Sequence, residues 1–143
     1  MALRRIVVVG CGSIGRRHAR ILKNRTDIAL ELCEPDAVNL ARALDEVGAV
    51  PTHTNFHEML TTHPDMVIIA TPHSLHAEQS IAALSANIHV LCEKPMSDTL
   101  ENAQRMLDVV KQSDSVFSVG FTLHFYPAMK AIKDLIASGE LGT

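Results

Sequence analysis

The sequence predicts an α/β fold built on one doubly wound parallel sheet, and three features predict it. Short apolar runs alternate with longer segments of helical period, which is the pattern of βαβ units. Several short runs, such as VVV and MVIIA, are apolar throughout, as strands must be when helices cover both faces of their sheet. The length of 143 residues, with 47% hydrophobic and 20% charged side chains, suits one core.

The apolar runs and the helical periods divide the chain into alternating elements. Strands are expected at residues 6–9, 28–33, 49–52, 66–70, 89–92 and 116–119. Helices are expected at residues 13–23, 37–46, 56–61, 75–86, 98–112 and 127–138. Two helix starts carry a capping residue, because Asn55 stands three before Glu58 and Asp98 stands three before Glu101. Both side chains are expected to accept hydrogen bonds from free amide groups of the first turn.

Composition argues against several classes of partner. The net charge of −3 and the 3% of aromatic residues offer neither a basic surface nor stacking rings, so no nucleic-acid partner is expected. No apolar run approaches the roughly 20 residues that cross a bilayer, so no membrane partner is expected. Cys11, Cys33 and Cys92 lack zinc spacing and are expected to be reduced thiols of a cytoplasmic protein. His53 and His57 stand four apart without a clear third ligand, so no metal is predicted.

A glycine-rich loop, GCGSIG, follows the first strand. Gly10, Gly12 and Gly15 form the pattern G-x-G-x-x-G between an expected strand and an expected helix, where it is typical of dinucleotide binding. The first glycine allows a tight turn, the second allows close approach of a pyrophosphate, and the third allows close helix packing. Ser13 and Ile14 begin the helix, whose free amide groups attract an anion. The alternative is a turn without a ligand. Three arginines of this helix are expected to form a solvated face rather than a phosphate clamp: Arg16, Arg17 and Arg20.

The second strand ends in an acidic residue. Glu34 lies 19 residues beyond Gly15, where a Rossmann domain places the carboxylate that accepts hydrogen bonds from the adenosine ribose. A carboxylate favours a free 2′-hydroxyl and repels a 2′-phosphate, and Pro35 and Asp36 supply no cation. NAD is therefore predicted as the cofactor in preference to NADP. The alternative is an ordinary acid in a turn before a helix.

Thr71 and Pro72 end the fourth strand at its carboxyl end. In an open α/β sheet this edge is where ligands bind, so both residues are candidates for cofactor contacts. His73 and His76 follow in the loop and the first helical turn, and they either contact the ligand or fix the turn. A structural role is favoured for His76, and both roles stay open for His73.

The fifth strand, HVLC, delivers Glu93, Lys94 and Pro95 to the same carboxyl edge. An ammonium group there could hydrogen-bond a substrate hydroxyl and stabilise alkoxide character as hydride leaves the carbon. Glu93 could orient this lysine. Pro95 would fix the backbone, and a cis Lys94–Pro95 bond is possible since cis bonds are nearly confined to proline. The alternative is a polar turn between a strand and a helix.

Four segments together resemble the Gfo/Idh/MocA oxidoreductase family: GCGSIGRRHA, ATPHSLHAEQSIAAL, HVLCEKPM and VGFTLHFYPAMKAIKDLIASGELGT. The resemblance implies an NAD(P)-dependent enzyme that acts on sugars, inositols or their derivatives. It also implies that Lys94 is the catalytic residue, with Glu93 and Pro95 completing its motif. His18 and His76 match positions common in the family, without an implied catalytic role.

The resemblance further implies how the chain is divided. Residues 1–120 are expected to form the dinucleotide-binding Rossmann domain. Residues 121–143 are expected to form a connecting segment and a helix that lead toward a second α/β domain, absent from this chain. In the family that domain supplies substrate contacts and the usual general acid or base, so the isolated chain is expected to be inactive. His124 stands where many members have arginine, and its substrate contact is therefore not carried over.

Three hypotheses of function follow. In the first, the chain is the N-terminal cofactor-binding domain of an oxidoreductase that transfers hydride between a sugar or polyol carbinol and nicotinamide, and that could form homo-oligomers. In the second, it is a stand-alone dinucleotide-binding module or sensor without turnover. A methyltransferase is a weaker third, because a glycine loop and an acid after the second strand could also hold S-adenosylmethionine. The complete E-K-P motif argues against it.

Overall fold

Six parallel strands form one sheet in the computed structural model, which describes residues 3–140. The strands are β1 (Arg4–Val9), β2 (Ile28–Cys33), β3 (Thr52–His53), β4 (Met66–Ile69), β5 (His89–Cys92) and β6 (Phe117–Val119). Their order across the sheet is β3-β2-β1-β4-β5-β6, so the winding reverses between β1 and β4. The predicted doubly wound parallel sheet is confirmed.

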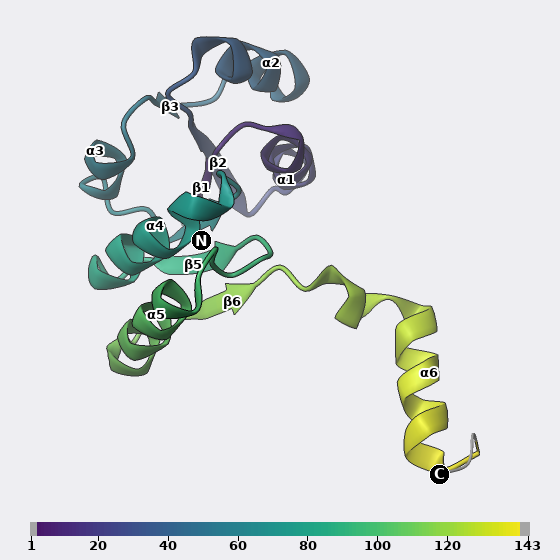
Figure 1. The fold of residues 1–143 in the computed structure, drawn as a ribbon. Coiled ribbons are helices and arrows are strands. Elements are labelled where there is room, and N and C mark those ends of the chain that lie inside the picture. Colours follow the sequence, from purple (N-terminus) through teal and green to yellow (C-terminus); the bar gives the residue numbers. More distant parts are fainter. Residues whose placement is uncertain (1–2, 141–143) are drawn as a thin grey trace.

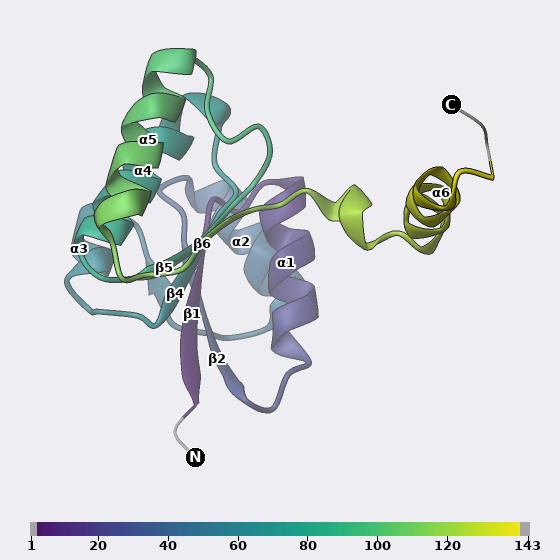
Figure 2. The same ribbon diagram turned by 90° about the horizontal axis from the view of Figure 1, so that it is seen from below.

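Helices cover both faces of this sheet (Figures 1 and 2). The covering helices are α1 (Ser13–Lys23), α2 (Ala37–Val47), α3 (Phe56–Leu60), α4 (His73–Ser85) and α5 (Leu100–Gln112). A 3₁₀ helix, η1 (Thr122–Phe125), and the last helix, α6 (Pro127–Ser138), follow β6. Buried residues of α1 and α2 pack on one face, and those of α3 and α4 pack on the other together with α5. Two core layers therefore enclose the strands.

Successive side chains of β1 point to opposite faces of the sheet, and both faces are covered, which explains why its Ile6–Val9 run is apolar throughout. Val7 and Val9 face the layer of α3, α4 and α5, whereas Ile6 and Val8 face the layer of α1 and α2. All four are at most 9% exposed. Burying one valine or isoleucine side chain contributes about 1.5–3 kcal/mol, so both faces favour the same strand.

Most expected elements are found with bounds that shift by one or two residues, and two helix starts differ for a physical reason. Helix α4 begins at His73 because Pro72, in an extended conformation, takes the capping position directly before it. Helix α5 begins at Leu100 because the Thr99 side chain accepts from the amide of Asn102. The prediction that Asp98 caps this helix was wrong, since its carboxylate binds the Asn102 side chain instead.

The predicted cap of the third helix is confirmed, and the third strand is shorter than expected. The Asn55 side chain accepts from the amides of His57 and Glu58, at 2.9 and 3.1 Å. Strand β3 spans two residues rather than the expected 49–52, because it pairs with β2 only at the end of that strand. Its carboxyl end nevertheless reaches the same edge of the sheet as the ends of β1 and β2.

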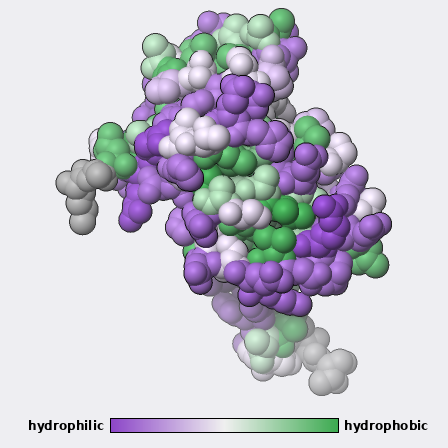
Figure 3. All heavy atoms as spheres, turned by 90° about the vertical axis from the view of Figure 1, so that its left-hand side faces the viewer, coloured by the Kyte–Doolittle hydropathy of each residue, from purple (hydrophilic) through white to green (hydrophobic). Residues whose placement is uncertain are grey.

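The segment after β6 leaves the sheet through η1 and continues into α6, which stands apart from the two helical layers (Figures 1 and 2). The large apolar side chains of α6 are exposed, from 38% at Leu135 to 64% at Ile136. Elsewhere, hydrophilic residues surround a smaller hydrophobic area on the side of the molecule where α3 and α4 lie (Figure 3). None of the helices within residues 3–140 combines the length and the apolar character that crossing a membrane requires.

Candidate functional site

The segments that the sequence predicted for the site lie together at the carboxyl edge of the sheet. The parallel ladder continues one residue past five strands. At three of them, the amides of Gly10, Glu93 and Gly120 donate to the carbonyl oxygens of Cys33, Ile69 and Cys92, at 2.9, 2.9 and 2.8 Å. Because neighbouring parallel strands end together here, the glycine loop and the E-K-P turn lie at the same edge. The reversal of winding between β1 and β4 is where an open α/β sheet forms its ligand crevice.

Two of the three motif glycines are required by the fold itself. Gly10 has φ +88°, and a Cβ there would lie 2.8 Å from the Ala70 carbonyl oxygen. A Cβ on Gly15 would overlap the carbonyl oxygen of Gly10, so only glycine lets α1 approach the loop. At Gly12, in contrast, a Cβ would meet nothing within 4 Å. The fold does not need this glycine, so the open space above it is available to a ligand.

The start of α1 offers amide groups to that space. Gly12 caps the helix without a side-chain hydrogen bond, and the amide of Arg16 bonds back to the Gly12 carbonyl at 2.9 Å. The amides of Ser13 and Ile14 precede this first helical bond, so they lack an intrahelical acceptor. Together with the helix dipole, they form the arrangement that binds phosphate groups.

Glu34 links the second strand to the glycine loop. Its side chain is almost buried, and its two carboxylate oxygens accept from the amides of Cys11 and Asp36 at 2.7 and 3.0 Å. A carboxylate has about four acceptor positions, so these two bonds leave capacity for ribose hydroxyls. The alternative from the sequence, an acid that fixes a turn, describes part of what Glu34 does.

A cavity of about 560 Å³ lies over this edge, within the size range of ligand pockets. Seven predicted cofactor residues line it: Gly10, Gly12, Ser13, Ile14, Glu34, Thr71 and Pro72. Nine further lining residues were not predicted as cofactor contacts: Val9, Cys33, Pro35, Asn39, Thr54, Phe56, Ala70, Leu75 and Gln79. The Thr71 hydroxyl donates to Gln79 Oε1 at 2.6 Å, which fixes the wall at the end of β4. The sequence did hold a signal for Thr54 and Phe56: both follow the third strand, whose carboxyl end lies at the ligand-binding edge of the sheet.

The other predicted cofactor residues lie outside this cavity. Gly15 packs beneath the loop, and His73 is exposed at the first position of α4. His76 is 1% exposed, and its ring nitrogens lie 2.8 and 2.9 Å from the carbonyl oxygens of Pro95 and Thr71. The ring thereby joins the end of β4 to the E-K-P turn, and this placement favours the structural role.

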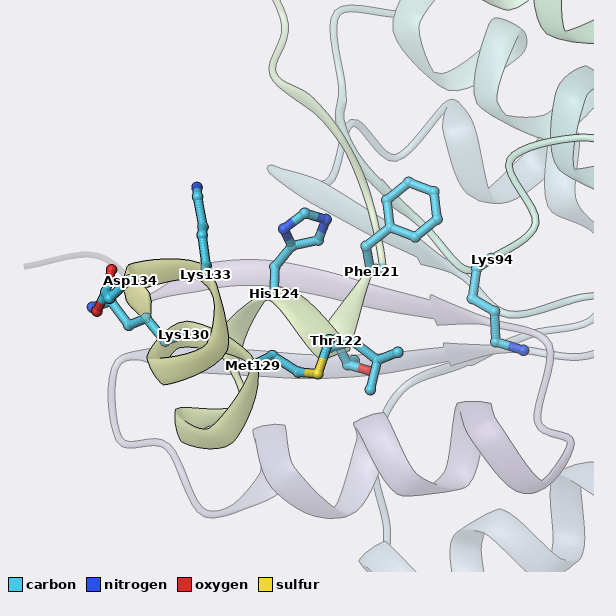
Figure 4. A pocket seen from close by; sticks show the side chains of 10 residues that line it. Lys94, Phe121, Thr122, His124, Met129, Lys130, Lys133 and Asp134 are labelled. Atoms are coloured by element: carbon cyan, nitrogen blue, oxygen red, sulfur yellow. The ribbon is translucent and has the colours of Figure 1, made fainter. Parts of the chain in front are cut away.

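Lys94 lines a second cavity of about 650 Å³ on the side of the connecting segment. Figure 4 shows Lys94 on one side of it, with Phe121 and His124 between Lys94 and the side chains of α6. Among residues 3–140, the Lys94 ammonium group has no carboxylate partner within 4.0 Å. The Lys94–Pro95 bond is cis, as the sequence allowed. An ammonium group without a carboxylate partner can donate to a bound hydroxyl.

Two side chains bind partners that differ from the sequence-based expectations. Glu93 accepts from the Lys94 amide at 3.3 Å and lies 2.8 Å from His18 Nε2, so it orients the backbone of Lys94 rather than its ammonium group. Arg16 is not a solvated side chain, because it donates to the Cys11 carbonyl and pairs with Glu46. Arg16 therefore supports the glycine loop, and its guanidinium group is not free to act as a phosphate clamp.

The three cysteines are free and buried. Burial raises the pKa of Cys11 and of Cys33 to about 12, and that of Cys92 to about 11. These thiols are therefore protonated at neutral pH and poor nucleophiles. Within the described residues, no three histidine, cysteine or acidic side chains gather as a metal site.

Comparison with known proteins identifies the family. The model of an oxidoreductase family with an NAD-binding Rossmann fold matches residues 4–121. The chain belongs to this family. The resemblance that the sequence motifs indicated is therefore confirmed.

Individual relatives share this fold over part of their length. An inositol 2-dehydrogenase of Corynebacterium glutamicum is 32% identical over 142 residues, which are 96% of this chain and 42% of the relative. A D-xylose 1-dehydrogenase [NADP(+)] of Haloarcula marismortui is 34% identical over 107 residues, 74% of this chain and 30% of the relative. The scyllo-inositol dehydrogenase of Lactobacillus casei, solved with NAD(H) and scyllo-inositol, superposes with a TM-score of 0.89 at 26% identity, over 98% of this chain and 42% of that one. The chain thus spans less than half the length of these relatives.

Proposed function

We propose that this chain is the cofactor-binding part of a dehydrogenase that transfers hydride between a carbinol carbon of a sugar or polyol and a nicotinamide cofactor. The observation that carries the proposal is the convergence of the glycine loop and Lys94 on one edge of the sheet. The names of the relatives, which include inositol and xylose dehydrogenases, support the substrate class.

Each part of the site has a separate task in this proposal. The amides of Ser13 and Ile14 hold the pyrophosphate, and Glu34 accepts from the adenosine ribose. When bound, the nicotinamide ring accepts or returns the hydride. The Lys94 ammonium group donates a hydrogen bond to the substrate oxygen and stabilises the negative charge that develops on it as hydride leaves. The unpaired ammonium group beside a cavity supports this role.

The preference for NAD over NADP rests on Glu34. A 2′-phosphate would approach an almost buried carboxylate that already accepts two amide hydrogen bonds. Two unit charges 4 Å apart repel by about 4 kcal/mol at an effective dielectric constant of 20, which is several hundredfold in affinity. Family membership alone leaves this choice open, because one relative carries NADP in its name.

The division of labour along the chain is part of the proposal. Residues 1–120 bind the cofactor, and residues 121–143 connect this domain to the part that completes the substrate site. His124 and Asp134 line the cavity beside Lys94, but among residues 3–140 no hydrogen bond fixes either side chain against Lys94, so we expect no turnover from the 143 residues alone. The buried reduced thiols favour a cytoplasmic location.

Calorimetric titration of the chain with NADH and NADPH tests the proposal. We expect NADH to bind at least tenfold more tightly than NADPH, and Glu34→Gln to reduce that ratio by weakening the repulsion of the 2′-phosphate. Asp36→Asn is the matched control, because it neutralises a nearby acid whose side chain caps α2. Equal affinity for both cofactors would remove the preference for NAD. Failure to bind either would remove the proposed function.

A further inference from the structure

The largely buried carboxylate of Glu93 joins the helix at the cofactor cleft to the E-K-P turn. His18 Nε2 of α1 lies 2.8 Å from Glu93 Oε1, although the two residues are 75 positions apart in the sequence. Their side chains are 22% and 13% exposed, so the pair is largely shielded from water. The other oxygen of Glu93 accepts from the Lys94 amide at 3.3 Å. The same carboxylate thus contacts a helix and the backbone of the lysine.

Gly120, directly after β6, leaves room for this carboxylate. A Cβ on Gly120 would lie 3.1–3.3 Å from the carboxyl carbon and both oxygens of Glu93, closer than ordinary contacts. The backbone of Gly120 does not have the positive φ that would demand glycine. The absence of a side chain here therefore serves the Glu93 carboxylate, and three separate elements enclose it.

His18 belongs to the same helix, α1, whose first turn faces the cofactor cleft. The first turn of α1 offers its amide groups to the cofactor cleft, and His18 lies one turn later on the same helix. A helix is stiff over this length, so its first turn and His18 move together. Through Glu93, the hydrogen bond from His18 therefore ties the position of the Lys94 backbone to the helix whose first turn faces the pyrophosphate.

We propose that His18 is a positioning residue, which acts through Glu93 to hold Lys94 in register with the bound nicotinamide cofactor. This inference rests on the proposed function, since it assigns a role within that same site. Neither His18 nor Gly120 touches the cofactor or the substrate in this proposal. Both shape the turn from which the lysine extends.

The test follows Lys94 itself by NMR. The five lysines are labelled as their ¹³C-dimethyl derivatives, and the Lys94 signal is assigned by its loss in Lys94→Arg. In the unmodified sequence, we expect saturating NADH to shift this signal. In His18→Leu, the NADH-induced shift should fall by at least half, while the affinity for NADH changes less than threefold. His18→Gln should restore the shift, because its amide can donate to Glu93.

Gly120→Ala provides an independent perturbation of the same carboxylate. It should reproduce the effect of His18→Leu on Lys94, and it keeps the proposal testable where His18→Leu fails to fold. Arg17→Leu, at an exposed position next to His18, is the matched control and should leave the Lys94 signal unchanged. An unchanged response of Lys94 in both His18→Leu and Gly120→Ala would overturn the proposal. So would a tenfold or larger loss of NADH affinity in His18→Leu, which would make His18 a determinant of cofactor binding.

A measurement on the free chain separates this inference from the proposed function. Hydrogen exchange of the Lys94 amide, which donates to Glu93, should become at least tenfold faster in His18→Leu than in the unmodified chain or in His18→Gln. Failure of NADH to bind would remove the proposed function, whereas this exchange result would still report on His18. Equal exchange rates in all three chains would show that His18 does not hold the turn.

Discussion

Replacing Gly12 by valine should abolish dinucleotide binding without disturbing the fold. Gly12 has φ −64° and ψ −171°, which any residue adopts, and a Cβ there would have no neighbour within 4 Å. We therefore expect the free energy of unfolding to change by less than about 1 kcal/mol. The added side chain would instead fill the space from which the amides of Ser13 and Ile14 reach a phosphate.

The expected loss of affinity follows from those two amides. A hydrogen bond to a charged group contributes about 1.5–3 kcal/mol, so losing both costs about 3–6 kcal/mol. At 1.4 kcal/mol for each factor of ten, this corresponds to roughly a 10²- to 10⁴-fold increase in Kd. Gly12→Ala, with one methyl group, should show a smaller loss than Gly12→Val.

Titration of NADH fluorescence measures the affinity, and urea denaturation measures the stability of the same samples. Ala131→Val is the matched control, since it adds bulk at an exposed position of α6. It should leave the Kd unchanged. A wild-type Kd for Gly12→Val in a folded chain would show that the glycine loop is only a turn, and the assignment of the cleft to a dinucleotide would fall with it.

Three further outcomes test the physical reasoning. Gly15→Ala should destabilise the fold by about 3 kcal/mol or more, because its Cβ overlaps the Gly10 carbonyl oxygen; an unchanged urea midpoint would refute this. Burial raises the pKa of Glu31, but bonds from Arg5 and His53 outweigh it and hold this pKa below its usual value of 4.5. Its carboxylate therefore stabilises the fold above pH 4.5, and this stabilisation is lost as the pH falls. Glu31→Gln should lower the free energy of unfolding by about 1–3 kcal/mol at pH 7 and by less at pH 3, which denaturation at the two pH values measures. The three buried thiols should react with a thiol reagent at pH 8 at least a hundredfold faster in urea than in the native chain; equal rates would contradict their burial.

Local patterns were enough to predict most of the strands and helices, and seven of the sixteen residues that line the cavity at the glycine loop. Continuous apolar runs predicted buried parallel strands, because a sheet covered on both faces leaves no polar side. The glycine spacing predicted the loop, since steric limits at Gly10 and Gly15 act between residues close in the sequence or at adjacent strand ends. Glu34 was found by its distance from this loop, which the length of one helix and one strand sets.

Several of the lining residues that were missed come from elements far apart in the sequence. Thr54 and Phe56 follow β3, whereas Leu75 and Gln79 belong to α4, and neither pair carries a motif. They meet over the glycine loop because the order of the strands brings the ends of β3 and β4 to either side of β1 and β2. That order depends on how helices pack on both faces, which a local pattern does not state.

The short-range spacing of residues thus predicted which kind of element forms and where the proposed phosphate contact lies. The choice of hydrogen-bond partner for individual polar side chains depended on three-dimensional packing. His18 and Glu93 are 75 positions apart, and His76 and Pro95 are 19 apart, yet both pairs lie 2.8 Å from each other. Such contacts exist only after parallel strands align their carboxyl ends, because the register of the sheet, and not the sequence interval, sets the distance between side chains.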